Sequence, residues 1–247
     1  MMKNYGRMTT CFSLATATLA AAGISASAAL IDLTPGPNAI NSAGSVSLAD
    51  LQSGQVMGIS VGDKWFTGFS YARTGDMPAP ADINVLGFRD QNGNWGVTFH
   101  GSFLDLPGGG SSDALVRFVA EVNPFNAQRG TRISDAHLFL SGAGVSNNSY
   151  FVVDESFLEN NQSMHAFKST IGQGGQQLSD WADFDPTHVR LHVTKDINAF
   201  AGQGSILPAR ATAIDQSFSQ ITIPEPATAA LSAVILGMLA IGQRRRA

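Results

Sequence analysis

Hydrophobic and polar residues alternate in short runs along the middle of the chain, and turn residues separate the runs. Trp95, Val97 and Phe99 share one face of an extended segment, opposite Thr98, and the run 114–122 repeats the pattern. Alternation with a period of two is typical of strands that bury one face. These segments therefore predict β-strands.

About ten strands are expected in all. Besides the two segments above, strands are predicted near 55–61, 64–72, 83–89, 133–140, 150–157, 164–170, 188–194 and 212–222. One short helix is expected near Ala49–Gln55, and the strand–helix rhythm of a parallel sheet is missing from the sequence. Many short strands at this spacing favour an all-β fold, with a single β-sandwich domain over 29–223 in a jelly-roll-like arrangement.

The N-terminal segment has the three parts of a secretory signal peptide. Lys3 and Arg7 form a positive region, an uncharged stretch follows over 11–24, and Ala26-Ser27-Ala28 offers a cleavage site. We expect residues 1–28 to direct export through the Sec translocon, with cleavage after Ala28 or Ala29. The alternative is a short membrane anchor, for which the apolar stretch is short.

The last 24 residues also have three parts. Pro224-Glu225-Pro226 precedes an uncharged, mainly apolar run over 227–242, and Arg244-Arg245-Arg246 follows. This order resembles the PEP-CTERM sorting signal of exported bacterial proteins. The resemblance implies a single transmembrane helix, a cytoplasmic basic cluster and recognition of the Pro-Glu-Pro motif by an exosortase. It implies anchoring in the inner membrane before processing, and then release to the cell surface or the extracellular matrix.

Short phrases in the body are also similar to those of uncharacterised PEP-CTERM proteins. They are Gly62-Asp63-Lys64, Lys195-Asp196-Ile197 and Gln216-Ser217-Phe218-Ser219-Gln220. This similarity implies no particular activity.

Charge and cysteine content exclude several kinds of function. Five of the fifteen basic residues and one of the nineteen acidic residues lie in the two end segments, so the body carries a net charge near −8. An acidic surface is unsuited to binding nucleic acid, whose phosphates need positive charge. The only cysteine, Cys11, belongs to the expected signal peptide, so a disulfide or a cysteine-bound zinc in the body is excluded.

Residues 180–186 are the strongest candidate for a ligand site. This segment is predicted to be a loop that carries Asp180, Asp183 and Asp185 together with Trp181. Carboxylate oxygens on a flexible loop suit Ca²⁺, and an exposed tryptophan suits a sugar ring. The alternative is a turn in which the aspartates accept backbone hydrogen bonds while the aromatic residues fill the edge of the core.

Two other motifs are interpreted as hairpins. The segment 58–62 matches G-x-S-x-G around Ser60, but a second strand is expected after it in place of the helix that a nucleophile elbow needs. Asp90-x-Asn92-x-Asn94 resembles the start of a calcium loop, but Trp95 stands where that loop needs glycine.

A polar stripe is expected on the strand near 188–194. His188, Arg190, His192 and Thr194 alternate with apolar residues and share one face. Histidines four residues apart on a strand are about 13 Å apart, too far for one metal ion. A solvent-exposed face is the first interpretation, and a small anion-binding stripe is the second.

The sequence favours an exported protein without catalytic activity that has a structural or binding role in the envelope or the extracellular matrix, with exopolysaccharide as a possible partner. The alternative is a secreted hydrolase that acts on polysaccharide. Ice binding would require regular Thr-x-Thr ranks, which the sequence does not contain.

Overall fold

The computed structural model describes residues 29–223. The expected signal peptide, the Pro224-Glu225-Pro226 motif, the apolar run and the arginine cluster Arg244, Arg245 and Arg246 lie outside the described residues. Within 29–223, no helix has the length and apolar character needed to cross a membrane.

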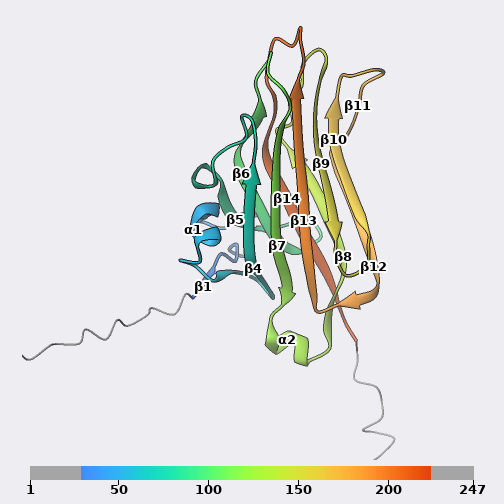
Figure 1. The fold of residues 1–247 in the computed structure, drawn as a ribbon. Coiled ribbons are helices and arrows are strands. Elements are labelled where there is room, and N and C mark those ends of the chain that lie inside the picture. The colour runs from blue at the N-terminus through green and yellow to red at the C-terminus, as the bar shows by residue number, and fades with distance from the viewer. Residues whose placement is uncertain (1–28, 224–247) are drawn as a thin grey trace, which may run out of the picture.

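Two β-sheets pack face to face, with the eight-stranded sheet nearer the viewer in Figure 1. Its strand order is β1 (Leu30–Asp32), β3 (Gly58–Val61), β4 (Lys64–Arg73), β7 (Ser112–Val122), β13 (Arg190–Ala201), β9 (Ser149–Phe157), β10 (Ser163–Ser169) and β11 (Gly175–Gln177). The six-stranded sheet has the order β12 (Ser179–His188), β8 (Thr131–Ser141), β14 (Ala209–Thr222), β6 (Trp95–Asp105), β5 (Asn84–Arg89) and β2 (Val46–Ser47). The expectation of an all-β sandwich is confirmed.

The hydrophobic core lies between the sheets, where the inward-facing side chains of both meet. Phe118 of β7 packs on Phe99 of β6, with ring centroids 5.7 Å apart, and Phe66 of β4 packs on Phe218 of β14 at 6.1 Å. All four rings are almost fully buried. Aromatic pairs of this kind join the two layers because each ring removes a large apolar area from water.

Three short helical segments lie at the edges and ends of the sandwich: α1 (Leu48–Ser53), the 3₁₀ turn Pro80–Asp82 and α2 (Pro124–Gln128). The expected helix near 49–55 is α1. The Ser47 side chain caps its N-terminus by accepting the Asp50 N–H at 3.1 Å, and Gly54 ends it in a left-handed conformation.

The predicted strands are present, with two corrections. Residues 180–186 do not form a loop, because they lie inside strand β12. Ala182 and Phe184 face the core, while Trp181, Asp183 and Asp185 point outward. The aspartates suggested a loop, although buried and exposed residues alternate regularly from Trp181 to Asp185. Pro186 is tolerated because β12 is an edge strand.

The strand expected at 188–194 is also corrected. His188 is the last residue of β12 in the six-stranded sheet, whereas β13 begins at Arg190 in the eight-stranded sheet. The chain passes from one layer to the other between them. The expected stripe is therefore divided between two sheets.

Candidate functional site

The most exposed tryptophan of the described chain lies on the outer face of the six-stranded sheet. Trp181 is 64% exposed near the start of β12. It stands directly opposite His137 of β8, which in turn stands opposite Ser217 of β14. Cross-strand neighbours in register have their side chains side by side on one face. Sheet pairing thus places an exposed indole beside an imidazole.

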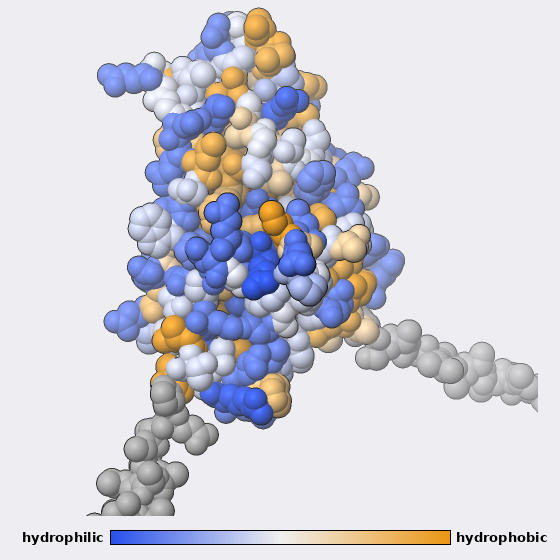
Figure 2. All heavy atoms as spheres, turned by 180° about the vertical axis from the view of Figure 1, so that it is seen from behind, coloured by the Kyte–Doolittle hydropathy of each residue, from blue (hydrophilic) through white to orange (hydrophobic). Residues whose placement is uncertain are grey.

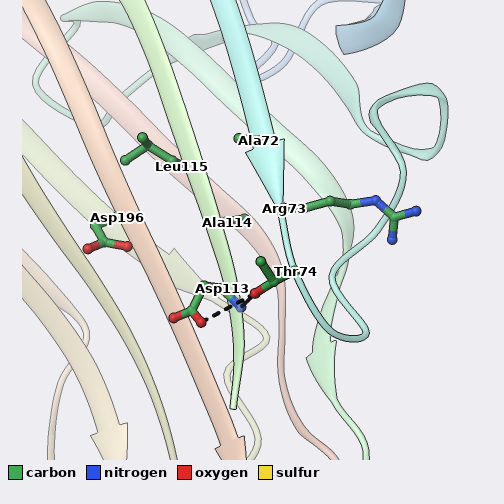
Figure 3. Close-up of a pocket in the computed structure, with 7 residues that line it drawn as sticks. All are labelled: Ala72, Arg73, Thr74, Asp113, Ala114, Leu115 and Asp196. Atoms are coloured by element: carbon green, nitrogen blue, oxygen red, sulfur yellow. Dashed lines mark hydrogen bonds between the residues drawn. The ribbon is translucent and has the colours of Figure 1, made fainter. Parts of the chain in front are cut away.

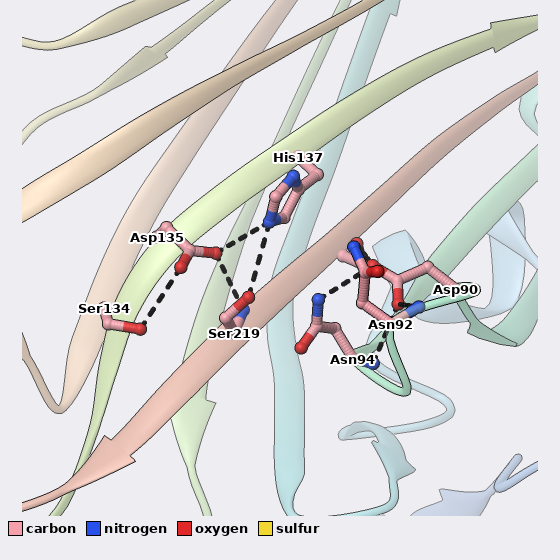
Figure 4. A network of polar contacts seen from close by, with 8 residues as sticks. Asp90, Asn92, Asn94, Ser134, Asp135, His137 and Ser219 are labelled. Carbon is pink, nitrogen blue, oxygen red and sulfur yellow. Dashed lines mark hydrogen bonds and ion pairs between the residues drawn. The ribbon is translucent and has the colours of Figure 1, made fainter.

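A polar network surrounds His137 (Figure 4). Its Nε2 lies 2.8 Å from Asp135 Oδ1 and 3.4 Å from Ser219 Oγ, and the Ser219 N–H donates to Asp135 at 3.3 Å. Although burial raises the pKa of Asp135, the hydrogen bonds from His137 and Ser219 outweigh this and lower it below the ordinary value. Asp135 is consequently an ionised acceptor.

The turn between β5 and β6 adds a second carboxylate to this face. Asp90 Oδ1 accepts the N–H groups of Asn92 and Asn94 at 2.8 and 2.9 Å, and Ser217 Oγ donates to Asp90 Oδ2 at 2.7 Å. Burial raises the pKa of Asp90, but these hydrogen bonds lower it overall. The expected hairpin is confirmed by the antiparallel pairing of β5 with β6, and the carboxylate of Asp90 accepts the hydrogen bonds that stabilise its turn.

The surrounding aspartates change the pKa of His137. The hydrogen bond to Asp135 raises the pKa of His137 above its ordinary value, against the effect of burial, and the charges of Asp135, Asp90 and Asp183 raise it further. His137 is therefore biased toward its protonated form. In that form both ring nitrogens are donors.

Aromatic rings extend the face along β8. His137 and Phe139 have nearly parallel rings with centroids 6.3 Å apart, and Phe88 of β5 meets Phe139 edge-on at 6.5 Å. We call Trp181, His137, Phe139, Asp135 and Asp183 the Trp181 face. It combines flat apolar rings with carboxylate acceptors, a pattern that suits a ligand with an apolar ring face and hydroxyl groups at its edge.

The molecule seen from the side opposite to Figure 1 is a mosaic (Figure 2). Hydrophobic residues appear there in separate small groups among hydrophilic ones. A surface of this kind is suited to partly polar ligands, whereas a large continuous apolar patch marks a protein or membrane interface.

The three candidate calcium ligands do not converge. Asp180 Oδ2 accepts the His165 N–H of β10 at 2.8 Å, which ties the edges of the two sheets together. Asp183 and Asp185 point outward from the strand, two residues apart, and Asp183 stands opposite Asp135. Within residues 29–223, no group of three or more His, Cys, Asp or Glu side chains is placed to hold a metal ion.

Ser60 lies in a hairpin, as expected. Strand β3 turns at Gly62 and pairs with β4, and Ser60 Oγ donates to Asp32 Oδ1 at 3.4 Å. The strand–turn–helix geometry that exposes a nucleophile is replaced by a strand–turn–strand. The G-x-S-x-G match is therefore structural.

Arg190 and His192 of β13 each contact an acidic side chain. Arg190 donates to Glu121 at 2.8 Å, and His192 Nδ1 lies 2.5 Å from Glu159 Oε1. The guanidinium of Arg190 is already paired with a carboxylate, so it offers little attraction to an anion. His188 lies in the other sheet, so it cannot contribute to an anion site on β13. The structure therefore does not support the anion-binding interpretation.

A shallow pocket of about 270 Å³ lies on the eight-stranded sheet (Figure 3). Asp113 and Asp196 point into this region, and Thr74 donates to Asp113 at 3.4 Å. Burial, followed by the charges of Asp113 and Asp154, raises the pKa of Asp196. Mutually repelling carboxylates leave this pocket less suited to an organic ligand than the Trp181 face.

His137 and Asp135 were not predicted as site residues from the sequence. Both lie on the predicted strand 133–140, at positions that alternate with buried Ala136 and Leu138. The alternation indicated that they face outward. It contained no signal that the neighbouring strand would bring Trp181 beside them.

No protein-family model matches the chain, and no curated protein matches it. Among solved structures, the chain is similar to a carbohydrate-binding module, TmCBM27, which was studied for specific mannan recognition. The likeness covers 72% of this chain and 94% of that one, at 10% identity and a TM-score of 0.30. Mannan recognition is a property of that module.

Proposed function

We propose that the protein is an exported, non-catalytic module with a structural or binding role in the envelope or the extracellular matrix, and that the Trp181 face binds a neutral polysaccharide. The route rests on the two end segments of the sequence: a signal peptide with Sec export, then sorting by an exosortase after transient anchoring of a C-terminal helix. We also propose jelly-roll-like connectivity, which is consistent with the repeated passage of the chain between the sheets.

One observation carries the binding proposal. Trp181 is 64% exposed, while Ala182 and Phe184 of the same strand are buried in the core. The strand therefore fixes the indole ring in a position that is exposed to solvent. Exposing a large aromatic ring forgoes the free energy of its burial. A sugar ring can cover the indole with its C–H face while carboxylates and the imidazole bind its hydroxyl groups.

The charges on this surface favour a neutral sugar. Asp135 and Asp90 are held ionised, and Asp183 is exposed opposite Asp135. Fixed negative charges repel uronates and sulfated sugars. The acidic body as a whole acts in the same direction.

The alternative, a polysaccharide hydrolase, would use the facing pair Asp135 and Asp183. Carboxylates on directly opposite residues lie close to each other, as retaining glycosidases require. Such a mechanism also needs a carboxylic acid with a raised pKa. The pKa of Asp135 is lowered, so Asp135 does not fit the part of that acid. Its carboxylate is also occupied by His137 and Ser219, which disfavours it as the nucleophile.

Affinity electrophoresis in gels that contain neutral or acidic polysaccharides tests the proposal. We expect retardation by at least one neutral polysaccharide, and at least about tenfold weaker binding for Trp181→Ala. Phe125→Ala is the matched control, since Phe125 is also exposed, at 61%, but lies on α2 at the end of the sandwich.

Equal binding by wild type and Trp181→Ala would contradict the assignment, as would equal loss in the control. Release of reducing ends by the wild type, abolished in Asp183→Asn, would support the hydrolase instead.

A further inference from the structure

Three polar side chains meet inside the core, between the two sheets. Glu155 of β9, Lys195 of β13 and Gln216 of β14 are each at most 1% exposed. They occupy inward positions that are otherwise apolar: Val153 and Phe157 flank Glu155, Val193 and Ile197 flank Lys195, and Ile214 and Phe218 flank Gln216. Burying such groups costs free energy unless a specific interaction compensates it.

The contacts among the three are direct. Lys195 and Glu155 are opposite each other in register, and Lys195 Nζ donates to Glu155 Oε2. The same Nζ lies 2.5 Å from Gln216 Oε1 of the other sheet. Since a C=O bond is about 1.23 Å long, Nζ lies within about 3.7 Å of the Gln216 carboxamide carbon. This is close to the separation from which an amine attacks a carbonyl.

Two atoms of this cluster have no hydrogen-bond partner among the described residues. They are Glu155 Oε1 and Gln216 Nε2. Buried polar atoms without partners are uncommon in native proteins and indicate strain, chemistry or an unobserved group. Glu155 Oε1 belongs to a carboxyl group that could give a proton, and Gln216 Nε2 is an amide nitrogen that could receive it if the amide were attacked.

The core also sets the protonation states that such chemistry needs. Burial lowers the pKa of Lys195 and raises the pKa of Glu155, against the opposing effect of their mutual attraction. Both changes favour a neutral amine facing a neutral carboxylic acid. Only the neutral amine has a free electron pair for attack.

We propose that Lys195 and Gln216 form an intramolecular isopeptide bond, with Glu155 as the proton-transfer group. The Lys195 nitrogen adds to the Gln216 carboxamide carbon, and Glu155 moves a proton from that nitrogen to the amide nitrogen. The C–Nε2 bond then breaks and ammonia leaves. One amine and one primary amide thus become one secondary amide and ammonia, without any oxidant or cofactor.

The Lys195 amine attacks Gln216 and not Glu155, because the reaction also needs a group that transfers protons. If Glu155 were the acceptor, the remaining carboxamide of Gln216 could not transfer protons at neutral pH. With Gln216 as the acceptor, the acid remains free to work as both base and acid. The product joins β13 to β14, and so the eight-stranded sheet to the six-stranded one, in a body that has no cysteine.

Peptide mapping of the purified, folded full chain tests the bond directly. After denaturation and trypsin digestion, we expect no cleavage after Lys195. Peptide 191–210 should be joined to the peptide that begins at Ala211, at about 17 Da below the sum of the two, the mass of ammonia. Lys64 is the internal control, because it is equally buried but contacts the carboxylate of Asp63, so normal cleavage is expected after it.

Normal cleavage after Lys195 in the wild type would overturn the proposal, and so would a link from Lys195 to Glu155 with loss of about 18 Da, the mass of water. Glu155→Gln keeps the size of the side chain but removes the proton-transfer group, and it should restore cleavage after Lys195. A link that persists in this variant would refute the role of Glu155. The wild-type map decides the main point even if the variant does not fold, and it is independent of sugar binding at Trp181.

Discussion

His137 combines three features: it pairs across the strands with Trp181, it contacts the charged Asp135, and it is partly exposed to solvent. Its ring lies between exposed Trp181 and the carboxylate of Asp135, and about a quarter of the side chain is accessible to water. A histidine with a raised pKa next to an aspartate with a lowered pKa forms an ion pair over a limited range of pH. Both the stability of the fold and the charge of the Trp181 face therefore depend on pH.

The sign of this dependence follows from the two shifts. The raised pKa of His137 contributes stability that is fully present below its unfolded value, about 6.5, and is lost as the pH rises through the folded value. The lowered pKa of Asp135 contributes stability that is present above its unfolded value, about 3.9, and is lost as the pH falls through the folded value.

We expect His137→Gln to lower the free energy of unfolding most between about pH 4 and pH 6.5, where both groups are charged. Because the pair is partly exposed, the loss should be below about 1 kcal/mol. Urea denaturation of both proteins at a series of pH values measures this difference. A difference that stays constant into alkaline solution would contradict the ion pair.

At the scale of elements, strand β12 determines what its residues can do. A strand directs alternate side chains to opposite faces, so Asp180 turns toward β10 while Asp183 and Asp185 face solvent. A calcium loop requires oxygens that converge on one point from a flexible backbone. The strand provides neither the convergence nor the flexibility.

Millimolar Ca²⁺ should accordingly leave the melting temperature unchanged. A ligand that binds the folded state stabilises it in proportion to the logarithm of its concentration, so even a weak site would give a measurable rise. Thermal denaturation with Ca²⁺ and with a chelator makes the comparison. A calcium-dependent rise that Asp183→Asn abolishes would restore the metal site.

At the scale of the whole molecule, the distribution of charge is consistent with the proposed export. The body is acidic and has no cysteine, and the two end segments carry the basic clusters. Positive charge beside an apolar segment prefers the cytoplasmic side of a membrane. We therefore expect both ends to begin in the cytoplasm and the sandwich to be outside.

A reporter fused after Ile223 tests this topology. An enzyme that is active only after export, such as a periplasmic phosphatase, should be active at this position. Deletion of residues 1–28 is the control and should abolish the activity. Activity of a reporter that works only in the cytoplasm would reject the export model.

Strands with one buried face were predictable. In β7 every second residue from Ala114 to Val122 is buried, so the sequence itself records which side faces the core. Strand β12 was misjudged because its exposed positions carry aspartate and its end carries proline, which are also the residues of turns. In this segment the turn-forming residues led to the prediction of a loop, although the alternation of buried and exposed positions is that of a strand.

The sequence alone determined the all-β class, most strand positions, the acidic body and the lack of a disulfide in the body, because these depend on composition and on neighbours along the chain. Only the tertiary structure decided that His137 lies beside Trp181 and that Lys195 reaches Gln216 across the core. Both contacts depend on the order of strands within the sheets and on how the sheets face each other. That order arises from packing the whole chain, so no single segment encodes it.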